Sequence, residues 1–385
     1  MTEPARPKPT VAIACGGTGG HLFPGLAVAD ELRKRGCRVH LLISAKEIDQ
    51  QAIAAAGESQ FSTLPAVGLT RGQALSFFLG FVGSYRRSMR FFREFRPHAV
   101  LAMGGFTSAP PILAGKRWGA SAFLHDSNSI PGKANRWLSR ISDGAFICFA
   151  QAGAHLRATR VTVIGTPVRP QFRQLDPLAA RAALGLDAAN PVLLVTGGSQ
   201  GASSLNSLTV SCVPTLRQFV PGLQVLHLTG AADLQRTKAA YSAAGVNAVV
   251  TAFLDKIWLA LASATVAVSR AGGASLAELA STRVPALLVP YPSATDNHQY
   301  FNALALQEAG AALLMEQHAA TPERMSAALK TLLLDSERRS AMQTVLANWD
   351  RPRAAEHIAL DILQRIGAIS AVSSADARQM NCAIA

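Results

Sequence analysis

The segment 15–25, CGGTGGHLFPG, packs four glycines, a threonine and a histidine into six positions between an apolar run and a helical pattern. Glycines after a strand let the backbone approach a phosphate, and the next helix start adds N–H donors and a positive dipole end. A histidine there could take a proton from a substrate hydroxyl, because its pKa lies near neutrality. His21 is therefore the first candidate base, with a turn cap or a phosphate contact as the alternative.

Two further polar clusters follow apolar runs. His125, followed by Asp126, ends an expected strand, where ligand-contacting residues of open α/β sheets collect, and it is the second candidate base. The stretch 269–278, SRAGGASLAE, is another glycine turn before a helix. Glu278 in it could accept two hydroxyl hydrogen bonds from a sugar, although an acid early in a helix more often complements the dipole.

Comparison with known sequence motifs narrows the possible functions of these glycine turns. The dinucleotide fingerprint fails at Leu22, and no Gly-Lys pair is followed by the Ser or Thr of a P-loop. The segment 197–201, GGSQG, does match the nucleophile elbow, so a hydrolase with Ser199 and a later pair such as Asp296 and His298 is an alternative. A pair of phosphate-type turns explains the loops of both halves, whereas the elbow explains one.

The elements that must position these residues alternate between strand and helix. This alternation predicts an α/β fold with mostly parallel sheets, arranged as two similar doubly wound Rossmann-like domains over 10–168 and 169–350. A helix is expected at 351–367, packing back on the N-terminal domain, and a frayed tail at 368–385. The expected strands are 10–15, 38–43, 98–103, 121–125, 145–149, 161–165, 191–196, 223–228, 247–251, 265–269 and 285–290.

Composition restricts the class of protein and its partners. The 385 residues carry a formal net charge of +13, which favours anionic partners. The five scattered cysteines suit a reducing compartment and argue against structural zinc. The N-terminus lacks a signal-peptide pattern, and the apolar runs are too short to span a bilayer.

Basic and aromatic residues concentrate at 71–96. The segment predicts either a solvated helix with a buried aromatic stripe or a membrane-surface element, in which phenylalanines insert and arginines meet anionic head groups. A nucleic-acid site is disfavoured because no such binding motif is present. Lys116, Arg117 and Trp118 could extend the patch. The membrane candidates are Phe77, Phe78, Phe81, Arg86, Arg87 and Arg90.

Seven segments in order resemble one family, the MurG lipid-linked peptidoglycan N-acetylglucosaminyltransferases, over about residues 10–365. They are GGTGGHLFPGLAVADEL, MGGFTSAP (103–110), HDSNSIPGKANRWL (125–138), GTPVR (165–169), GGSQGASSLN (197–206), RAGGASLAE (270–278) and DNHQYFNA (296–303). The sequence departs from the family pattern at Asp126 and Ser127 and in the loop 291–298.

The resemblance implies a GT-B fold with a central cleft. It implies transfer of GlcNAc from UDP-GlcNAc to the C4 hydroxyl of MurNAc in lipid I, at the cytoplasmic side of the inner membrane by a peripheral enzyme. Another GT-B enzyme of UDP-GlcNAc, such as a glycolipid transferase or a 2-epimerase, is the nearest alternative. A single displacement would invert the anomeric centre.

The resemblance also implies site residues. The N-terminal domain would bind the acceptor, with Gly104 and Gly105 as a cradle for the lipid diphosphate, and the C-terminal domain would bind most of the donor. Because no D-x-D motif occurs, no metal is expected, and Arg169, Ser199 and helix N-termini would stabilise the leaving UDP. The implied donor contacts are Thr18, Gly19, Gly20, Asn128, Arg169, Ser199, Leu254, Gly273, Ala274, Ser275, Leu276, Ala277, Glu278 and Gln299.

Overall fold

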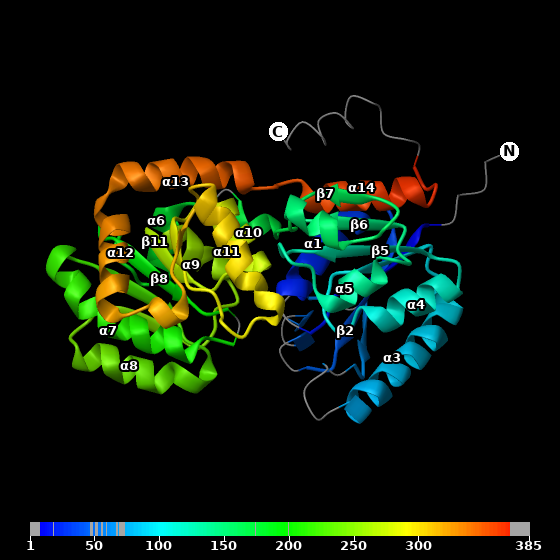
Figure 1. Cartoon of the computed structure of the whole chain (residues 1–385), viewed down its shortest axis with the longest axis horizontal. Coiled ribbons are helices and arrows are strands. Elements are labelled where there is room, and N and C mark those ends of the chain that lie inside the picture. Colours follow the sequence, from blue (N-terminus) through cyan, green and yellow to red (C-terminus); the bar gives the residue numbers. More distant parts are fainter. Residues whose placement is uncertain are drawn as a thin grey trace. The chain divides into compact units, whose positions relative to one another are not determined.

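The computed structural model divides the chain into two units, each with its own parallel sheet (Figure 1). Unit 1 comprises Met1–Arg169 and Pro352–Ala385, and unit 2 comprises Pro170–Arg351. The described residues are 8–17, 19–46, 49–50, 53–54, 57–58, 60–66, 68, 74–173, 175–198 and 200–369.

Unit 1 is built on a seven-stranded parallel sheet with the order β3-β2-β1-β4-β5-β6-β7. The order reverses beside β1, so the loops after β1 and β4 diverge at the carboxyl edge, where open α/β sheets bind ligands. The strands are β1 (Thr10–Ala14), β2 (Arg38–Ser44), β3 (Phe61–Leu64), β4 (Ala99–Ala102), β5 (Ser121–Asp126), β6 (Gly144–Ile147) and β7 (Val161–Val163).

Both faces of this sheet are covered by helices, as the apolar strands require. Val11 and Ile13 belong to the core that α1 (Gly19–Lys34) and α14 (Ala354–Arg365) complete. Ala12 and Ala14 face the opposite core, which α3 (Ala74–Phe95), α4 (Ala109–Arg117) and α5 (Lys133–Leu138) complete. The period-2 alternation of β1 thus divides its side chains between two cores.

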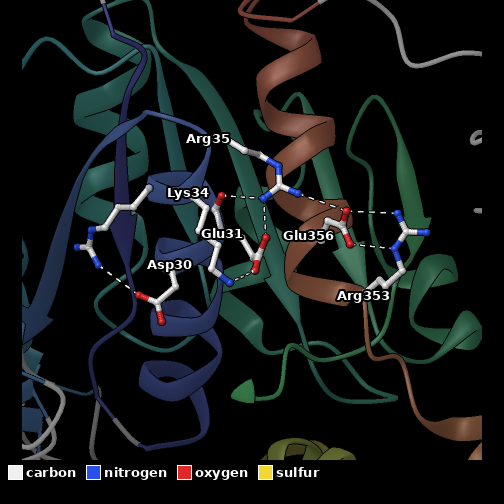
Figure 2. A network of polar contacts seen from close by, with 7 residues as sticks. Asp30, Glu31, Lys34, Arg35, Arg353 and Glu356 are labelled. Carbon is white, nitrogen blue, oxygen red and sulfur yellow. Dashed lines mark hydrogen bonds and ion pairs between the residues drawn. The ribbon is translucent and has the colours of Figure 1, made fainter. Parts of the chain in front are cut away.

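The helix α14 brings the chain back to unit 1 after unit 2 and packs on α1. Figure 2 shows the ion pairs that join the two helices: Arg35 on the loop after α1 contacts both Glu31 of α1 and Glu356 of α14, the latter at 3.3 Å. Glu356 also accepts from Arg353 at 2.8 Å. The helix that begins at the first glycine turn is therefore held at its far end by the C-terminal helix.

Unit 2 repeats the architecture with a six-stranded parallel sheet of order β10-β9-β8-β11-β12-β13. The order again reverses beside its first strand, so the loops after β8 and β11 diverge at the carboxyl edge. The strands are β8 (Val192–Thr196), β9 (Gln224–Leu228), β10 (Ala248–Thr251), β11 (Val266–Ser269), β12 (Ala286–Leu288) and β13 (Leu313–Leu314).

Helices also surround the second sheet. Leu193 and Val195 lie in the core completed by helices α7 (Ser203–Phe219) and α12 (Pro322–Leu334). Thr321 and Asp335 cap α12 and α13 by accepting from the backbone N–H groups of Arg324 and Arg338. The helices are α6 (Pro177–Ala183), α7 (Ser203–Phe219), α8 (Leu234–Ala243), α9 (Ile257–Ser263), α10 (Gly273–Thr282), α11 (His298–Glu308), α12 (Pro322–Leu334) and α13 (Ser336–Trp349).

All eleven expected strands are present, with ends shifted by up to two residues. Two strands were missed, β3 and β13, which lie at sheet edges and are short and only partly buried. The C-terminal helix is shorter than expected, ending at Arg365. Ala368 and Ile369 pack against the unit 1 core, which corrects the expected start of the tail, and 370–385 lie outside the described residues. Within the described ranges, no helix combines the length and the apolar character needed to cross a bilayer.

Candidate functional site

The first glycine turn follows β1 and leads directly into α1. Gly17 has a φ of +114°, a conformation that side chains rarely adopt, and α1 begins two residues later at Gly19. Gly19 and Gly20 form the start of α1, where the first N–H groups of a helix have no partner within the helix and can serve an anion. Thr18, a predicted donor contact, lies outside the described residues.

His21 lies in the first turn of α1, half-buried, with its ring against two glycines of the loop after β4. A Cβ built on Gly104 would stand 2.9 Å from His21 Nε2, and one on Gly105 would stand 3.1 Å from His21 Nδ1. Both glycines have positive φ angles, +108° and +78°. Because they lack side chains, both glycines leave space for the imidazole, a role that the sequence did not indicate. Their role as a cradle for the lipid diphosphate stays a prediction.

His125 is the second-to-last residue of β5 and is completely buried. Its Nε2 lies 2.9 Å from the carbonyl oxygen of Gly165, so Nε2 carries a proton and donates it there. Burial lowers the pKa of His125, and the nearby His21 lowers it further, against the opposing effects of Gly165 and Asp126. Of the two candidate bases, His21 is thus the one that the described structure leaves partly accessible.

Asp126 holds the loop that follows β5. Its carboxylate accepts hydrogen bonds from the backbone N–H groups of Asn128 and Gly132, each at 2.9 Å, and from the side-chain amide of Asn135, also at 2.9 Å. Asn135 Nδ2 also donates to the carbonyl oxygen of His125 at 2.9 Å. The acid of the HDSN segment therefore shapes the loop that carries Asn128, a predicted donor contact.

Arg169 brings a positive charge to the beginning of α1. Its guanidinium carbon lies 4.0 Å from the ring centroid of Phe23, two residues after His21, in cation–π geometry. Both residues belong to unit 1. A fixed guanidinium beside a helix N-terminus suits the recognition of a phosphate oxygen.

The glycine turn after β8 is shaped by close backbone contacts. A Cβ on Gly201 would stand 2.0 Å from the carbonyl oxygen of Thr229, and one on Gly230 would stand 2.4 Å from that of Gln200. The turns after β8 and β9 therefore lie backbone to backbone, which only glycine permits. Ser199, predicted to bind the donor, lies outside the described residues.

Arg270 is a buried cation at the carboxyl ends of three strands, and sequence reasoning did not select it. Nη1 donates to the carbonyl oxygens of Val289 and Pro290, both at 3.0 Å. Nη2 donates to Ser204 Oγ at 3.1 Å and Gln317 Oε1 at 2.7 Å. Burial lowers the pKa of Arg270 from its usual value. The available signal was an arginine placed directly after the strand Val266–Ser269.

The start of α10 is held from α11. Gln299 Oε1 accepts from the N–H groups of Ala271 and Tyr291 at 3.2 and 3.0 Å, and Asn302 Nδ2 donates to the Ala271 carbonyl at 3.0 Å. Gln299 therefore connects the loops after β11 and β12.

The donor contacts predicted on α10 differ in burial. Gly273 and Leu276 are buried, and the half-buried ones are Ala274, Ser275, Ala277 and Glu278. Leu254, the predicted contact after β10, is also half-buried.

Helix α3 has features of both alternatives for the basic aromatic segment, the buried aromatic stripe and the exposed surface element. Phe92 and Phe95 are buried in the core, as a structural stripe would be. Near its beginning, Leu75, Phe78 and Leu79 are exposed by 72%, 61% and 61%. Phe77 and Phe81 are half-buried, with ring centroids 6.3 Å apart, and Arg86, Arg87 and Arg90 are exposed.

The hydrolase alternative gains no geometric support from its histidine. His298 Nδ1 lies 2.8 Å from the carbonyl oxygen of Thr295, so this local bond uses the N–H that a triad acid would accept. Among the described residues, no three His, Cys, Asp or Glu side chains gather in a way that could hold a metal ion.

Comparisons with known proteins identify the family. The glycosyltransferase family 28 N-terminal domain matches residues 11–147, and the C-terminal domain of the same family matches 192–358. A curated protein of Desulforudis audaxviator, named UDP-N-acetylglucosamine--N-acetylmuramyl-(pentapeptide) pyrophosphoryl-undecaprenol N-acetylglucosamine transferase, is 35% identical over 369 residues, which are 92% of this chain and 98% of that protein. The chain belongs to this transferase family. A member from Geobacter sulfurreducens is 34% identical over 351 residues, 90% of this chain and 96% of its own.

Solved structures agree with this membership in the transferase family. The crystal structure of Acinetobacter baumannii MurG superposes with a TM-score of 0.72 at 26% identity, over 93% of this chain and all of that chain. A Neisseria meningitidis UDP-GlcNAc 2-epimerase bound to UDP-GlcNAc gives a TM-score of 0.68 at 16% identity, over 92% of this chain and all of that chain. The epimerase likeness shows the fold alone, which two different activities therefore share.

Proposed function

We propose that this protein transfers N-acetylglucosamine from UDP-N-acetylglucosamine to the C4 hydroxyl of the N-acetylmuramyl unit of lipid I, forming lipid II for peptidoglycan synthesis. The observation that carries this proposal is 35% identity to a curated transferase over 98% of that protein's length. The same names identify the donor as UDP-N-acetylglucosamine and the acceptor as an undecaprenol-linked muramyl pentapeptide.

His21 is the group that we propose as general base. It is half-buried at the carboxyl edge of the unit 1 sheet, whereas His125 is fully buried and bonded to Gly165. The acceptor oxygen attacks the anomeric carbon as its proton passes to His21, the bond to UDP breaks, and the leaving diphosphate takes the electron pair. This single displacement inverts the anomeric configuration and forms no covalent glycosyl-enzyme.

The charge on the departing UDP requires donors that need no metal, since the sequence has no D-x-D motif. We assign this role to Arg169, whose guanidinium is stacked on Phe23, and to the helix N-termini that follow the glycine turns. Glu278, half-buried on α10, would accept hydroxyl hydrogen bonds from the donor.

Helix α3 is the element that we propose to contact the membrane from the cytoplasmic side. Exposed Leu75, Phe78 and Leu79 would enter the interface, and exposed Arg86, Arg87 and Arg90 would meet anionic head groups. This arrangement would keep the enzyme beside an acceptor whose lipid tail stays in the bilayer.

The test is product analysis. The full chain is incubated with UDP-GlcNAc and a lipid I analogue, and the disaccharide product is isolated. A β-linked GlcNAc-MurNAc product, identified by the coupling constant of its anomeric proton, is the expected result. An α-linked product would overturn the inverting displacement, and covalent labelling of Ser199 by a fluorophosphonate probe would favour the hydrolase alternative.

A further inference from the structure

Asp49 is a buried acid outside the residues considered so far. It follows β2 in a short helical segment, and its side chain is completely buried. Its Oδ2 accepts the backbone N–H of Gly17 at 2.6 Å and the hydroxyl of Ser44 at 2.5 Å. Burying a carboxylate is costly unless hydrogen bonds compensate it, and here the compensating donors include the first glycine turn itself.

Other side chains bind the backbone of Gly16 and Gly17. Thr107 Oγ1 donates to the Gly16 carbonyl at 2.7 Å, and Lys46 Nζ donates to the Gly17 carbonyl at 3.1 Å. Gly16 also passes so close to β2 that a Cβ on it would stand 2.1 Å from the backbone nitrogen of Ser44. The end of β2, the segment after it and the loop after β4 therefore hold Gly16–Gly17 in place.

This arrangement changes what the turn can offer to a ligand. A glycine turn that cradles a phosphate presents free N–H groups, but the Gly17 N–H is already engaged by a carboxylate. The Gly16–Gly17 segment is thus a fixed support, and anion binding at this turn must use groups further along, at the start of α1.

The support leads directly to the proposed base. His21 is four residues after Gly17, and its ring occupies the space beside Gly104 and Gly105. A Cβ on Gly105 would stand 3.5 Å from the Gly16 carbonyl, so both glycine loops and the imidazole meet at one place. We propose that Asp49 is a positioning residue that fixes the first glycine turn and thereby orients His21 for proton removal. This inference rests on the proposed function.

The experiment compares Asp49→Ala with Asp49→Asn in the full chain. Misplacing a catalytic group by about 1 Å costs on the order of 100-fold in rate, so we expect Asp49→Ala to lower kcat by at least about 10-fold. The dissociation constant of UDP-GlcNAc should change less than about 3-fold, because Gly16 and Gly17 themselves offer no anion contact and the proposed function places most of the donor on unit 2. Asp49→Asn should recover most of kcat, since its amide oxygen can still accept from Gly17.

Hydrogen exchange gives a readout independent of turnover. In ligand-free protein, Asp49→Ala should accelerate exchange in the peptide that covers Gly17, while peptides of β8 keep the wild-type rate. Thr107→Val tests the same support through a smaller change and should also lower kcat, which covers the case in which Asp49→Ala does not fold. The matched controls are Asp143→Asn and Thr209→Val. In the wild type, the Asp143 carboxylate accepts the Ala122 N–H at 2.7 Å, and the buried Thr209 hydroxyl donates to the Leu205 carbonyl within α7.

The outcomes separate the two proposals. Inactive wild-type protein would refute the proposed function, whatever the exchange data show. The positioning role alone would be overturned if the wild type is active but Thr107→Val and a folded Asp49 variant keep its kcat and its exchange rates. A loss of UDP-GlcNAc affinity that matches the loss of kcat would also overturn it, because the turn would then serve donor binding.

Discussion

The imidazole of His21 occupies the space that a side chain at Gly104 would need: a Cβ there would stand 2.9 Å from both Cδ2 and Nε2 of the ring. The contact joins the first turn of α1 to the loop after β4, on neighbouring strands of the sheet. It therefore makes the position of the proposed base sensitive to a single methyl group.

Gly104→Ala should displace His21 and strain the loop. We expect kcat to fall by at least about 10-fold, since proton transfer depends on geometry, and stability to fall by about 1–2 kcal/mol because φ is +108°. Gly119→Ala is the matched control: its φ is +77°, but nothing lies within 4 Å of the added Cβ. Steady-state kinetics and urea unfolding measure both effects. Equal kcat losses in the two variants would show that backbone strain, not His21, is responsible.

His21→Ala tests the base role itself. Removal of a positioned general base lowers kcat by about 100- to 10,000-fold, and we expect a loss in this range with donor affinity nearly unchanged. Turnover of the acceptor and calorimetric titration with UDP-GlcNAc give the two quantities. If turnover stays near wild type, His21 is not the base; if donor binding alone is lost, its role is a phosphate contact.

The buried His227 predicts a stability loss in acid. It is bonded to Tyr241 Oη at 2.9 Å and Asn206 Oδ1 at 3.0 Å, and burial lowers its pKa to about 3. Its unfolded pKa is about 6.5, so the unfolded state binds a proton as pH falls below that value while the folded state does not. This group should therefore remove about 2 kcal/mol of unfolding free energy between pH 7.5 and pH 5.

His227→Gln isolates that contribution. The variant should be less stable than wild type at pH 7.5, because buried hydrogen bonds are lost, but its further loss down to pH 5 should be smaller by about 2 kcal/mol. Urea unfolding at the two pH values measures the difference, with substitution of the exposed His155 as control. An identical pH dependence in wild type and His227→Gln would rule out this assignment.

Helix α3 should carry the attachment to anionic membranes. Charge reversal at Arg86, Arg87 and Arg90 should remove about 3 kcal/mol of attraction, at roughly 1 kcal/mol per basic residue near the surface, and abolish co-sedimentation with phosphatidylglycerol liposomes at low salt. Reversal of the exposed Lys238 and Arg338 in unit 2 is the control. Unaltered sedimentation of the α3 variant would refute α3 as the membrane contact.

Much of the fold could be predicted because central strands are apolar on both faces. The runs at β1, β4, β8 and β11 lie inside the sheets, so all their residues except the terminal Thr10 and Thr196 are buried. All four edge strands are only partly buried, since one neighbour pairs with each, but β7 (VTV) and β10 (AVVT) are rich in β-branched residues. The missed edge strands β3 (FSTL) and β13 (LL) lack that signal. Their pairing depends on tertiary context.

The site was predictable to the extent that its glycines marked sharp turns. The residues that hold the turns were not, because Asp49 and Arg270 act through partners distant in sequence: Asp49 bonds Gly17, and Arg270 bonds Gln317. Sequence spacing also gave no means to tell a buried His125 from a half-buried His21. The two histidines can be distinguished only in the folded structure, where the Gly165 carbonyl lies within hydrogen-bond distance of the His125 ring.

The most direct test of the transferase activity is whether release of UDP requires the acceptor. The full chain is incubated with UDP-GlcNAc alone and with UDP-GlcNAc plus a lipid I analogue, and UDP and disaccharide are quantified over time. We predict no UDP release without the acceptor, and equimolar UDP and disaccharide with it. Formation of UDP or UDP-ManNAc in the absence of acceptor would contradict the transferase function and support the epimerase alternative.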